Sequence, residues 1–223
     1  MALRAARKAG DFIVRASDDM DRIGYQAKAA ADFVTEVDIA AEKEILYQLG
    51  KTYPEHRFLC EESGLSGNED SEYTWVIDPL DGTSLIAQGR HGAISVIALA
   101  ERGAMFEPQQ AFYMEKLCVP FEAADAVDIN APVGQNIKAV ADALGKDPCD
   151  ISVAVLDRPR HSELIYNIRR AGARVHLIAD GDVAAALAAA TPDNDVDMLM
   201  GIGGSPEGVI AAAAMRCIGG GFQ

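Results

Sequence analysis

Two aspartates that follow an apolar segment carry the clearest chemical signal in the sequence. The segment 75–84 reads WVIDPLDGTS, so Asp78, Asp81 and Thr83 lie on a tight turn shaped by a proline and a glycine. Carboxylates this close repel each other unless a cation lies between them. Hard oxygen ligands of this kind favour Mg²⁺ or Mn²⁺ over zinc. An Asx-type turn with solvated acids explains the same spacing equally well.

Two acidic segments precede this turn. FLCEESG places Glu61 and Glu62 just after a short apolar run, and FVTEVD places Asp38 at the expected start of a helix. Asp38 alone is better explained as a helix N-cap, a role that Thr35 can also fill. Glu62 alone is explained as a solvated neighbour of Glu61. Taken together with the turn at 78–84, the acids favour a divalent-metal site.

The second half of the chain places further polar residues after expected strands. Asp157 and Arg158 follow ISVAVL, Asp180 follows VHLIA, and a GIGG turn follows DVDMLM. Ligands of open α/β sheets bind at the carboxyl ends of the strands. Each residue alone fits an ordinary turn, but their shared position favours a binding site.

Apolar periodicity predicts the elements that position these residues. The order of strands and helices after residue 150 predicts a mostly parallel sheet covered by helices. The polar stretch 63–72 is expected to be a loop, and the division into domains is expected near 130–135, giving domains 1–130 and 131–223. The expected helices cover 3–16, 36–49, 136–144, 161–171, 182–190 and 206–217, and the expected strands cover 57–60, 73–77, 93–100, 111–119, 125–129, 151–156, 174–178 and 197–200.

Composition excludes several classes of protein. The formal net charge of −14 argues against nucleic acid as the main partner. The four cysteines are scattered without a C-x-x-C pair, which fits reduced thiols and neither a zinc site nor a disulfide scaffold. The charged N-terminus does not resemble a signal peptide, and no apolar run approaches the ~18 residues of a membrane span. We expect a soluble, cytoplasmic protein with no nucleic-acid or membrane partner.

The order VTEVD, EES, DPLDGT resembles the metal-binding signature of the inositol monophosphatase/fructose-1,6-bisphosphatase superfamily. The resemblance implies an α/β fold, a layered αβαβα sandwich, with two or three Mg²⁺ or Mn²⁺ ions. It also implies hydrolysis of phosphomonoesters by in-line attack of a water held at those ions. By motif position it implies that Asp38, Glu61 and Thr83 take part in catalysis, that Glu61, Asp78, Asp81 and the Leu80 carbonyl bind metal, and that Asp81, Gly82 and Thr83 contact substrate.

The resemblance divides along the chain. Residues 1–84 resemble bacterial inositol monophosphatases, whereas the remainder resembles class II fructose-1,6-bisphosphatase through FYMEKL, DRPRH, GARVHLIADGDVAAAL and GIGGSPEGVIAAAAMRCIGGG. A natural recombinant, a deliberate chimera and a divergent intermediate all fit this division. In the second family Glu207 is the implied final metal ligand, since the W-D-x-A-A motif of inositol monophosphatases is absent. The implied sugar-bisphosphate contacts are Tyr113, Arg158, Pro159, Arg160, Asp180, Gly181, Asp182 and Gly204.

Three functions remain open. The first is hydrolysis of fructose 1,6-bisphosphate to fructose 6-phosphate and phosphate, a gluconeogenic step, which Arg158 and Arg160 favour because they can grip a distal phosphate. Surface solvation or a salt bridge is their alternative role. The second is an inositol-phosphate phosphatase. The third is a catalytically silent binding domain, favoured because the chain stops soon after Glu207, where both families continue. We expect a small sugar phosphate as the ligand, and a homo-oligomer of two or four chains.

Overall fold

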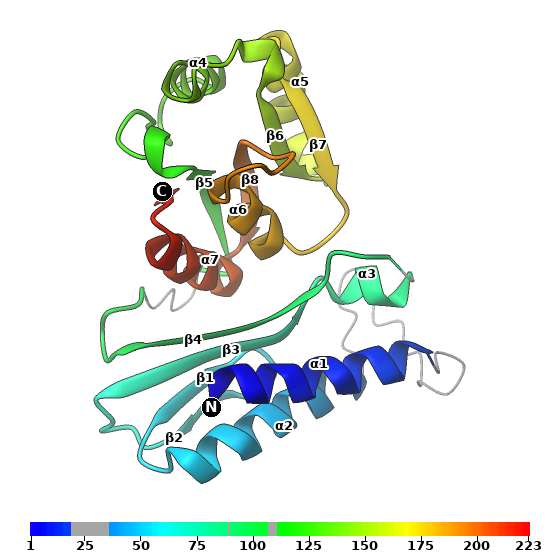
Figure 1. Cartoon of the computed structure of the whole chain (residues 1–223), viewed down its shortest axis with the longest axis vertical. Coiled ribbons are helices and arrows are strands. Elements are labelled where there is room, and N and C mark those ends of the chain that lie inside the picture. The colour runs from blue at the N-terminus through cyan, green and yellow to red at the C-terminus, as the bar shows by residue number, and fades with distance from the viewer. Residues whose placement is uncertain (19–35, 89, 107–110) are drawn as a thin grey trace. The chain divides into compact units, whose positions relative to one another are not determined.

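The computed structural model describes residues 1–18, 36–88, 90–106 and 111–223. The chain forms two compact units, Met1–Glu107 and Pro108–Gln223, and each has its own sheet and its own apolar core (Figure 1). The division falls earlier than the position near 130 expected from the sequence. The reason is that the strand β5 (Tyr113–Val119) pairs with β8 (Met198–Gly204), and so it belongs to the second unit.

Unit 1 packs two helices on one face of a four-stranded sheet. Small residues of the first helix, Ala5 and Ala9, are fully buried and allow it to lie close against the second helix, whose Ile45 and Leu49 are also buried. The strand order is β2-β1-β3-β4, with β1 parallel to β3 and the other pairs antiparallel. The elements are α1 (Ala2–Asp18), α2 (Glu36–Thr52), β1 (Arg57–Cys60), β2 (Gly64–Gly67), β3 (Tyr73–Asp81), α3 (Thr83–Ala87) and β4 (Ile94–Glu101).

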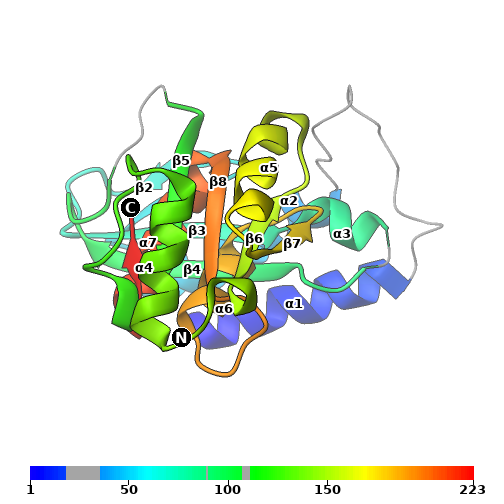
Figure 2. The ribbon, with the colours of Figure 1, turned by 90° about the horizontal axis from the view of Figure 1, so that it is seen from above.

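Unit 2 is a five-stranded sheet with helices on both faces (Figures 1 and 2). The strand β6 is buried on both sides, as its apolar sequence SVAVL requires. Helices α4 and α5 cover one face with large apolar side chains, whereas α6 and α7 cover the other mainly with alanines. The remaining elements are η2 (Phe121–Ala123), α4 (Val133–Leu144), η3 (Pro148–Asp150), β6 (Ser152–Leu156), η4 (Pro159–His161), α5 (Ser162–Arg170), β7 (Arg174–Ile178), α6 (Val183–Ala190), α7 (Ser205–Ile218) and β9 (Gly221–Phe222).

The sheet of unit 2 is mixed, not mostly parallel. Its order is β7-β6-β8-β5-β9, with β6 parallel to β7 and β8, and β5 antiparallel to β8 and β9. Because β6, β7 and β8 run in one direction, their carboxyl ends lie along one edge. Tyr113 at the beginning of the antiparallel β5 pairs with Gly204 at the end of β8, so it lies at the same edge.

Three local expectations are corrected by the structure. Residues 125–129 form turns where a strand was expected, because the side chain of Asn136 bonds both the N–H and the C=O of Asp128 and takes the place of a partner strand. The stretch 63–72 is not only loop, since β2 folds back on β1 as an antiparallel pair. The short elements α3 and β9 were not expected at all.

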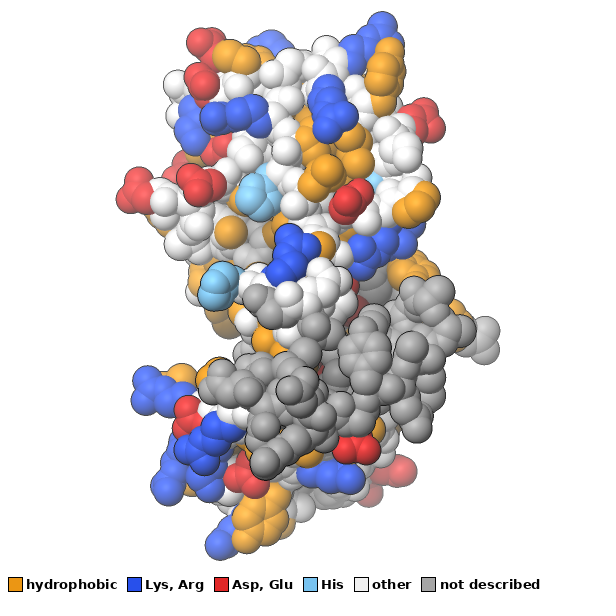
Figure 3. Space-filling view, turned by 90° about the vertical axis from the view of Figure 1, so that its right-hand side faces the viewer, with side chains coloured by type: hydrophobic (Ala, Val, Ile, Leu, Met, Phe, Trp, Pro, Cys, Tyr) orange, Lys and Arg blue, Asp and Glu red, His pale blue; other side chains and the backbone are white. Residues whose placement is uncertain are grey.

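The surface carries charges of both signs. Figure 3 shows Lys and Arg side chains interspersed with Asp and Glu on the face it presents, with no single large patch of one sign among the coloured residues. Within the described part of the chain, every helix is too short or too polar to cross a membrane.

Candidate active site

The last part of β3 places Asp78 in the interior of unit 1. Asp78 is only 2 % exposed, and the N–H of Leu80 donates to its Oδ1 at 3.0 Å. Its Oδ2 is also buried and has no hydrogen-bond partner among the described residues. The pairing of β3 with β4 is irregular between Asp78 and Asp81, where Pro79 provides no N–H. Gly82 then turns the chain with φ +90°, a conformation that favours glycine.

Other carboxylates surround Asp78. Burial raises the pKa of Asp78 from 3.8 to about 10, and Glu61, Asp81 and Asp38 add to the shift because their negative charges disfavour another. Glu61 follows β1 directly, and its N–H donates to the carbonyl of Ile77, the residue before Asp78. The parallel pairing of β1 with β3 therefore brings the two acidic segments of the sequence together.

Asp38 and Thr83, both expected to take part in catalysis, lie in contact. The Thr83 hydroxyl lies 3.3 Å from Asp38 Oδ2 and 3.0 Å from the Leu80 carbonyl oxygen. Asp38 is buried in the first turn of α2, and burial, followed by Glu61, raises its pKa to about 8. Helix α2 begins at Glu36, so Asp38 lies inside the helix and not at its N-cap. Thr35, the other expected cap, lies outside the described residues.

Glu42 is a residue of this site that the sequence analysis missed. It lies one turn after Asp38 on the buried face of α2, and its two carboxylate oxygens accept hydrogen bonds from the N–H groups of Glu62 (2.8 Å) and Ser63 (3.0 Å). The helix thereby fixes the turn that carries Glu61. An available signal was the i, i+4 spacing of two acids within the apolar stripe of α2.

The donor set of unit 1 fits hard divalent cations. Glu61, Asp78 and Asp81 offer only oxygen, and the buried unpartnered oxygen of Asp78 is the kind of atom that a cation satisfies. Within the ranges that the structure describes, no three acidic, histidine or cysteine side chains already form a closed metal-binding group. Glu207, the expected final ligand, belongs to unit 2.

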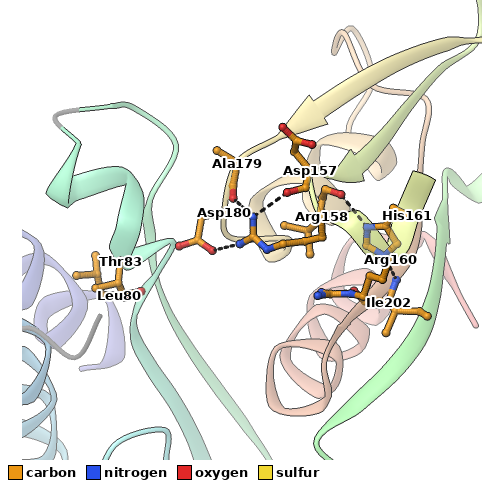
Figure 4. Close-up of polar contacts among 10 residues, drawn as sticks. Leu80, Thr83, Asp157, Arg158, Arg160, His161, Ala179, Asp180 and Ile202 are labelled. Carbon is orange, nitrogen blue, oxygen red and sulfur yellow. Dashed lines mark hydrogen bonds and ion pairs between the residues drawn. The ribbon is translucent and has the colours of Figure 1, made fainter. Parts of the chain in front are cut away.

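In unit 2, Arg158 joins two turns at the edge of the sheet (Figure 4). Its Nη1 donates to the carbonyls of Ala179 (2.6 Å) and Asp157 (3.1 Å), and its Nη2 lies 3.0 Å from Asp180 Oδ1. Arg158 therefore makes the salt bridge that was the alternative role for these arginines. The turns after β6 and β7 are held together by this contact.

Arg160 is exposed and has a different set of partners. Its Nε and Nη2 donate to the Ile202 carbonyl at 3.1 and 2.8 Å, and its guanidinium lies 5.3 Å from the centre of the Tyr113 ring. His161 supports the same strand end, because its ring contacts the Leu156 carbonyl (2.7 Å) and the Ile202 N–H (2.8 Å) (Figure 4). A carbonyl only accepts and an N–H only donates, so the proton of a neutral ring lies on Nδ1.

Asp182 and Lys116 form a buried ion pair that the sequence analysis did not identify. Lys116 Nζ lies 2.6 Å from Asp182 Oδ2, and their side chains are 1 % and 6 % exposed. Asp182 Oδ1 is buried without a hydrogen-bond partner among the described residues. Glu207, in the first turn of α7, folds back over Gly204, since a Cβ added there would overlap its carboxylate.

Each unit therefore assembles part of the expected set. Unit 1 brings Asp38 and Thr83 together beside the acids of the β3 turn. Unit 2 brings the turn after β6, the turn after β7 and the end of β8 to one edge of its sheet. Pro159 begins η4 there, and Gly181 has φ +69° in the turn between Asp180 and Asp182.

Comparison with known proteins identifies relatives of both the sequence and the fold. The chain is 50% identical over 147 residues to a D-fructose 1,6-bisphosphatase class 2/sedoheptulose 1,7-bisphosphatase of Microcystis aeruginosa, covering 66% of this chain and 42% of that protein. It is 45% identical over 176 residues to the protein of the same name from Synechocystis sp., covering 74% and 51%. The chain thus spans about half the length of the curated relatives it matches.

Two solved structures share the fold. The extragenic suppressor protein suhB of Bartonella henselae has a TM-score of 0.57 at 22% identity, covering 84% of this chain and 72% of that one. The MJ0109 gene product, an inositol monophosphatase-fructose 1,6 bisphosphatase, has a TM-score of 0.53 at 13% identity, covering 94% and 82%. These likenesses confirm the layered α/β fold expected from the sequence.

A match to a protein-family model shows the family to which the chain belongs. The model of bacterial fructose-1,6-bisphosphatase, glpX-encoded, matches residues 5–223 and so extends across both the segment before residue 85 and the segment after it. The chain belongs to the glpX-encoded family of bacterial fructose-1,6-bisphosphatases.

Proposed function

We propose that this chain is a divalent-metal-dependent phosphatase that removes a phosphate from fructose 1,6-bisphosphate. The observation that carries the proposal is Asp78, a buried carboxylate with one unpartnered oxygen and three further acids close by. Such a cluster is costly as it stands, and divalent cations would satisfy it. The substrate class rests on family membership and on relatives named for the bisphosphates of fructose and sedoheptulose.

Two or three Mg²⁺ or Mn²⁺ ions are the proposed cofactors. Glu61, Asp78, Asp81 and the Leu80 carbonyl, all in unit 1, would hold them. When bound, these ions supply positive charge that acidifies a nearby water and neutralises the phosphate. Glu42 contributes by holding the backbone of the turn after Glu61 in place.

Asp38 and Thr83 are proposed to handle the proton of the attacking water. When the Thr83 hydroxyl donates to Asp38 Oδ2, its own lone pairs are left to accept a hydrogen bond from a water. Burial, followed by Glu61, raises the pKa of Asp38 in the metal-free protein. As a carboxylate in the metal-loaded protein, Asp38 would accept the proton that the water releases.

The edge of the unit 2 sheet is proposed to bind the rest of the substrate. Arg160 is exposed and held in orientation by the Ile202 carbonyl, so it is better suited than Arg158 to grip the distal phosphate. Arg158 would act indirectly, by fixing Asp180. The unpartnered Oδ1 of Asp182 would accept a hydrogen bond from a sugar hydroxyl.

The test is phosphate release from fructose 1,6-bisphosphate and from inositol 1-phosphate, with Mg²⁺, with Mn²⁺ and with a chelator. We expect metal-dependent release from the bisphosphate, faster than from the monophosphate. Asp78→Asn should lower it by several powers of ten, while Asp70→Asn, a change of an exposed aspartate in the same unit, should not. Undiminished turnover in chelator, or a preference for inositol 1-phosphate, would overturn the proposal.

A further inference from the structure

Asp182 occupies a helix N-cap without capping the helix. It precedes α6 directly, the position where an aspartate normally accepts hydrogen bonds from first-turn amides. Its side chain makes no capping bond to the described helix and is paired with Lys116 of β5 instead. Helix capping therefore does not explain the position of this side chain, which is set by Lys116.

The Lys116 ammonium is fixed by three elements. A Cβ added to Gly203 of β8 would lie 2.7 Å from Nζ and would overlap Asp182 Oδ2, and one added to Gly208 of α7 would lie 3.1 Å from Lys116 Cε. The lysine side chain thus occupies space that two glycines leave open. A buried ammonium needs a partner, and Asp182 Oδ2 at 2.6 Å provides it.

This arrangement leaves Asp182 Oδ1 buried and without a donor among the described residues. A buried oxygen without a hydrogen bond is destabilising, and more so when it is charged, so a donor group of a ligand would complement it. A phosphate oxygen is unsuitable because it would repel the carboxylate. A divalent cation is disfavoured by the adjacent Lys116 ammonium. Among the groups of a sugar phosphate, the sugar hydroxyl is the one that can donate a hydrogen bond to this oxygen.

We propose that Lys116 is a positioning residue for sugar recognition, which holds Asp182 by Oδ2 so that Oδ1 accepts a hydrogen bond from a ligand hydroxyl. The inference deepens the proposed function and rests on it for the identity of the ligand as a sugar phosphate. Lys116 is a cation and could bind a phosphate directly. By this inference it contributes instead to recognition of the sugar, through Asp182.

The test measures equilibrium binding by calorimetry in a chelator, where no metal-dependent turnover occurs. Fructose 1,6-bisphosphate and inorganic phosphate are the two probes, and Lys116→Met is the variant. The matched control is Lys146→Met, which removes a lysine paired at 2.5 Å with Asp197, a carboxylate whose other oxygen accepts from the Ser152 N–H. We expect Lys116→Met to bind the bisphosphate about tenfold more weakly, the worth of one charge-assisted hydrogen bond. Phosphate binding should stay within about twofold.

A double-mutant cycle shows whether Lys116 acts through Asp182. Asp182→Asn should weaken bisphosphate binding, and adding Lys116→Met should then change it less than about twofold. If Lys116→Met alone does not fold, the double variant still does so by our account, because it leaves no unpaired buried charge. Comparing bisphosphate binding of the double variant with that of Asp182→Asn then shows whether Lys116 acts through Asp182.

The remaining outcomes contradict the inference. Equal losses for bisphosphate and phosphate would mean that Lys116 is an anion-binding cation. Unchanged bisphosphate binding in Lys116→Met would mean that the pair does not orient a sugar contact. The proposed phosphatase function is judged separately, by phosphate release after metal is added back.

Discussion

Asp78 has one carboxylate oxygen bonded to the Leu80 N–H and the other buried without a partner among the described residues. In the metal-free protein its pKa is raised from 3.8 to about 10, so the folded state holds a proton that the unfolded state releases above pH ~4. Stability should therefore fall as the pH rises from about 4 to about 10. Asp78→Asn removes the part of this dependence that Asp78 causes and leaves the part below pH ~8 that Asp38 causes. In chelator at neutral pH it should raise Tm by roughly 2–8 °C.

Thermal unfolding in chelator across this pH range checks the prediction, with Asp70→Asn as the control. Asp70 is exposed, so its amide variant should follow the unmodified chain. The same change that removes metal-dependent activity is thus expected to stabilise the metal-free fold. Equal pH slopes for Asp78→Asn and the unmodified chain would show that Asp78 is not the buried acid responsible.

Thr83 is a second residue whose proposed role can be tested by one substitution, because kcat and KM should respond differently. Its hydroxyl contacts Asp38 Oδ2 and the Leu80 carbonyl, and it is proposed to act on the attacking water. Thr83→Ala should lower kcat by about 10²-fold with little change in KM, because the lost group serves the reaction and not the binding of the sugar. Thr191→Ala removes a hydroxyl that likewise bonds a carbonyl, that of Leu187, and should leave both constants unchanged. Steady-state kinetics provide the measurement. A higher KM with unchanged kcat in Thr83→Ala would contradict a role in the reaction step.

The sequence was informative about residues whose chemistry lies in a short motif. Asp38, Asp78 and Thr83 were selected because each stands in a recognisable local pattern, and the structure places Asp38 and Thr83 in contact. Glu42 and Lys116 were missed, since their meaning depends on partners 20 and 66 residues away. A buried charge is recognised only once the fold has brought its counterpart to it.

At the scale of elements, periodicity predicted each long helix and most strands, and β1 and β7 were predicted to the residue. The elements that were not predicted correctly are either short or depend on contacts with residues elsewhere in the sequence. The helix α3 has five residues and β9 has two, too few to show a period. The strand β2 contains two glycines and exists because β1 lies beside it. The expected strand at 125–129 lacks a partner because Asn136 bonds its backbone instead.

The junction between α2 and the turn after β1 gives the prediction at this scale. Glu42 on α2 holds the N–H groups of Glu62 and Ser63, so it should determine how Glu61 is presented to a cation. Glu42→Gln replaces one acceptor with an amide donor that faces a backbone N–H. We expect Mn²⁺ affinity to fall about 10–100-fold, as for other groups that orient metal ligands.

Calorimetric titration with Mn²⁺ provides the measurement, without substrate. The matched control is Glu44→Gln, the same substitution two residues further along α2, where the side chain contacts Lys8 and Gln48 and not the β1 turn. A similar loss of Mn²⁺ affinity in both variants would point to general electrostatics and against a positioning role for Glu42.

At the scale of the whole molecule, the chain divides its chemistry between two units. Unit 1 carries the acids proposed to hold metal, and unit 2 carries the arginines and aspartates proposed to recognise the sugar phosphate. The sequence analysis placed the division near 130–135, later in the chain than the boundary between the two units. Strand β5 looked like part of the first half by order alone, and only its pairing with β8 shows otherwise.

Recognition of a second phosphate distinguishes a bisphosphatase from a monophosphatase, and Arg160 is the residue proposed to provide it. Its Nε and Nη2 bond the Ile202 carbonyl and it lies over Tyr113, so its guanidinium is held in place while remaining exposed. Arg160→Ala should lower kcat/KM for fructose 1,6-bisphosphate about 10–100-fold, the effect of one charge-assisted contact. Hydrolysis of inositol 1-phosphate, which has no distal phosphate, should hardly change.

The control is Arg174→Ala. Arg174 is also exposed and also donates to a backbone carbonyl, that of Asp150, but it begins β7 and therefore lies at the opposite edge of the sheet from the strand ends that carry Arg160. Its loss should affect neither substrate. Equal losses on both substrates in Arg160→Ala would assign the arginine to the phosphate that is cleaved, or to the fold. Recognition of the distal phosphate would then have to come from other residues, and the chain's preference for a bisphosphate would lose its support in the structure.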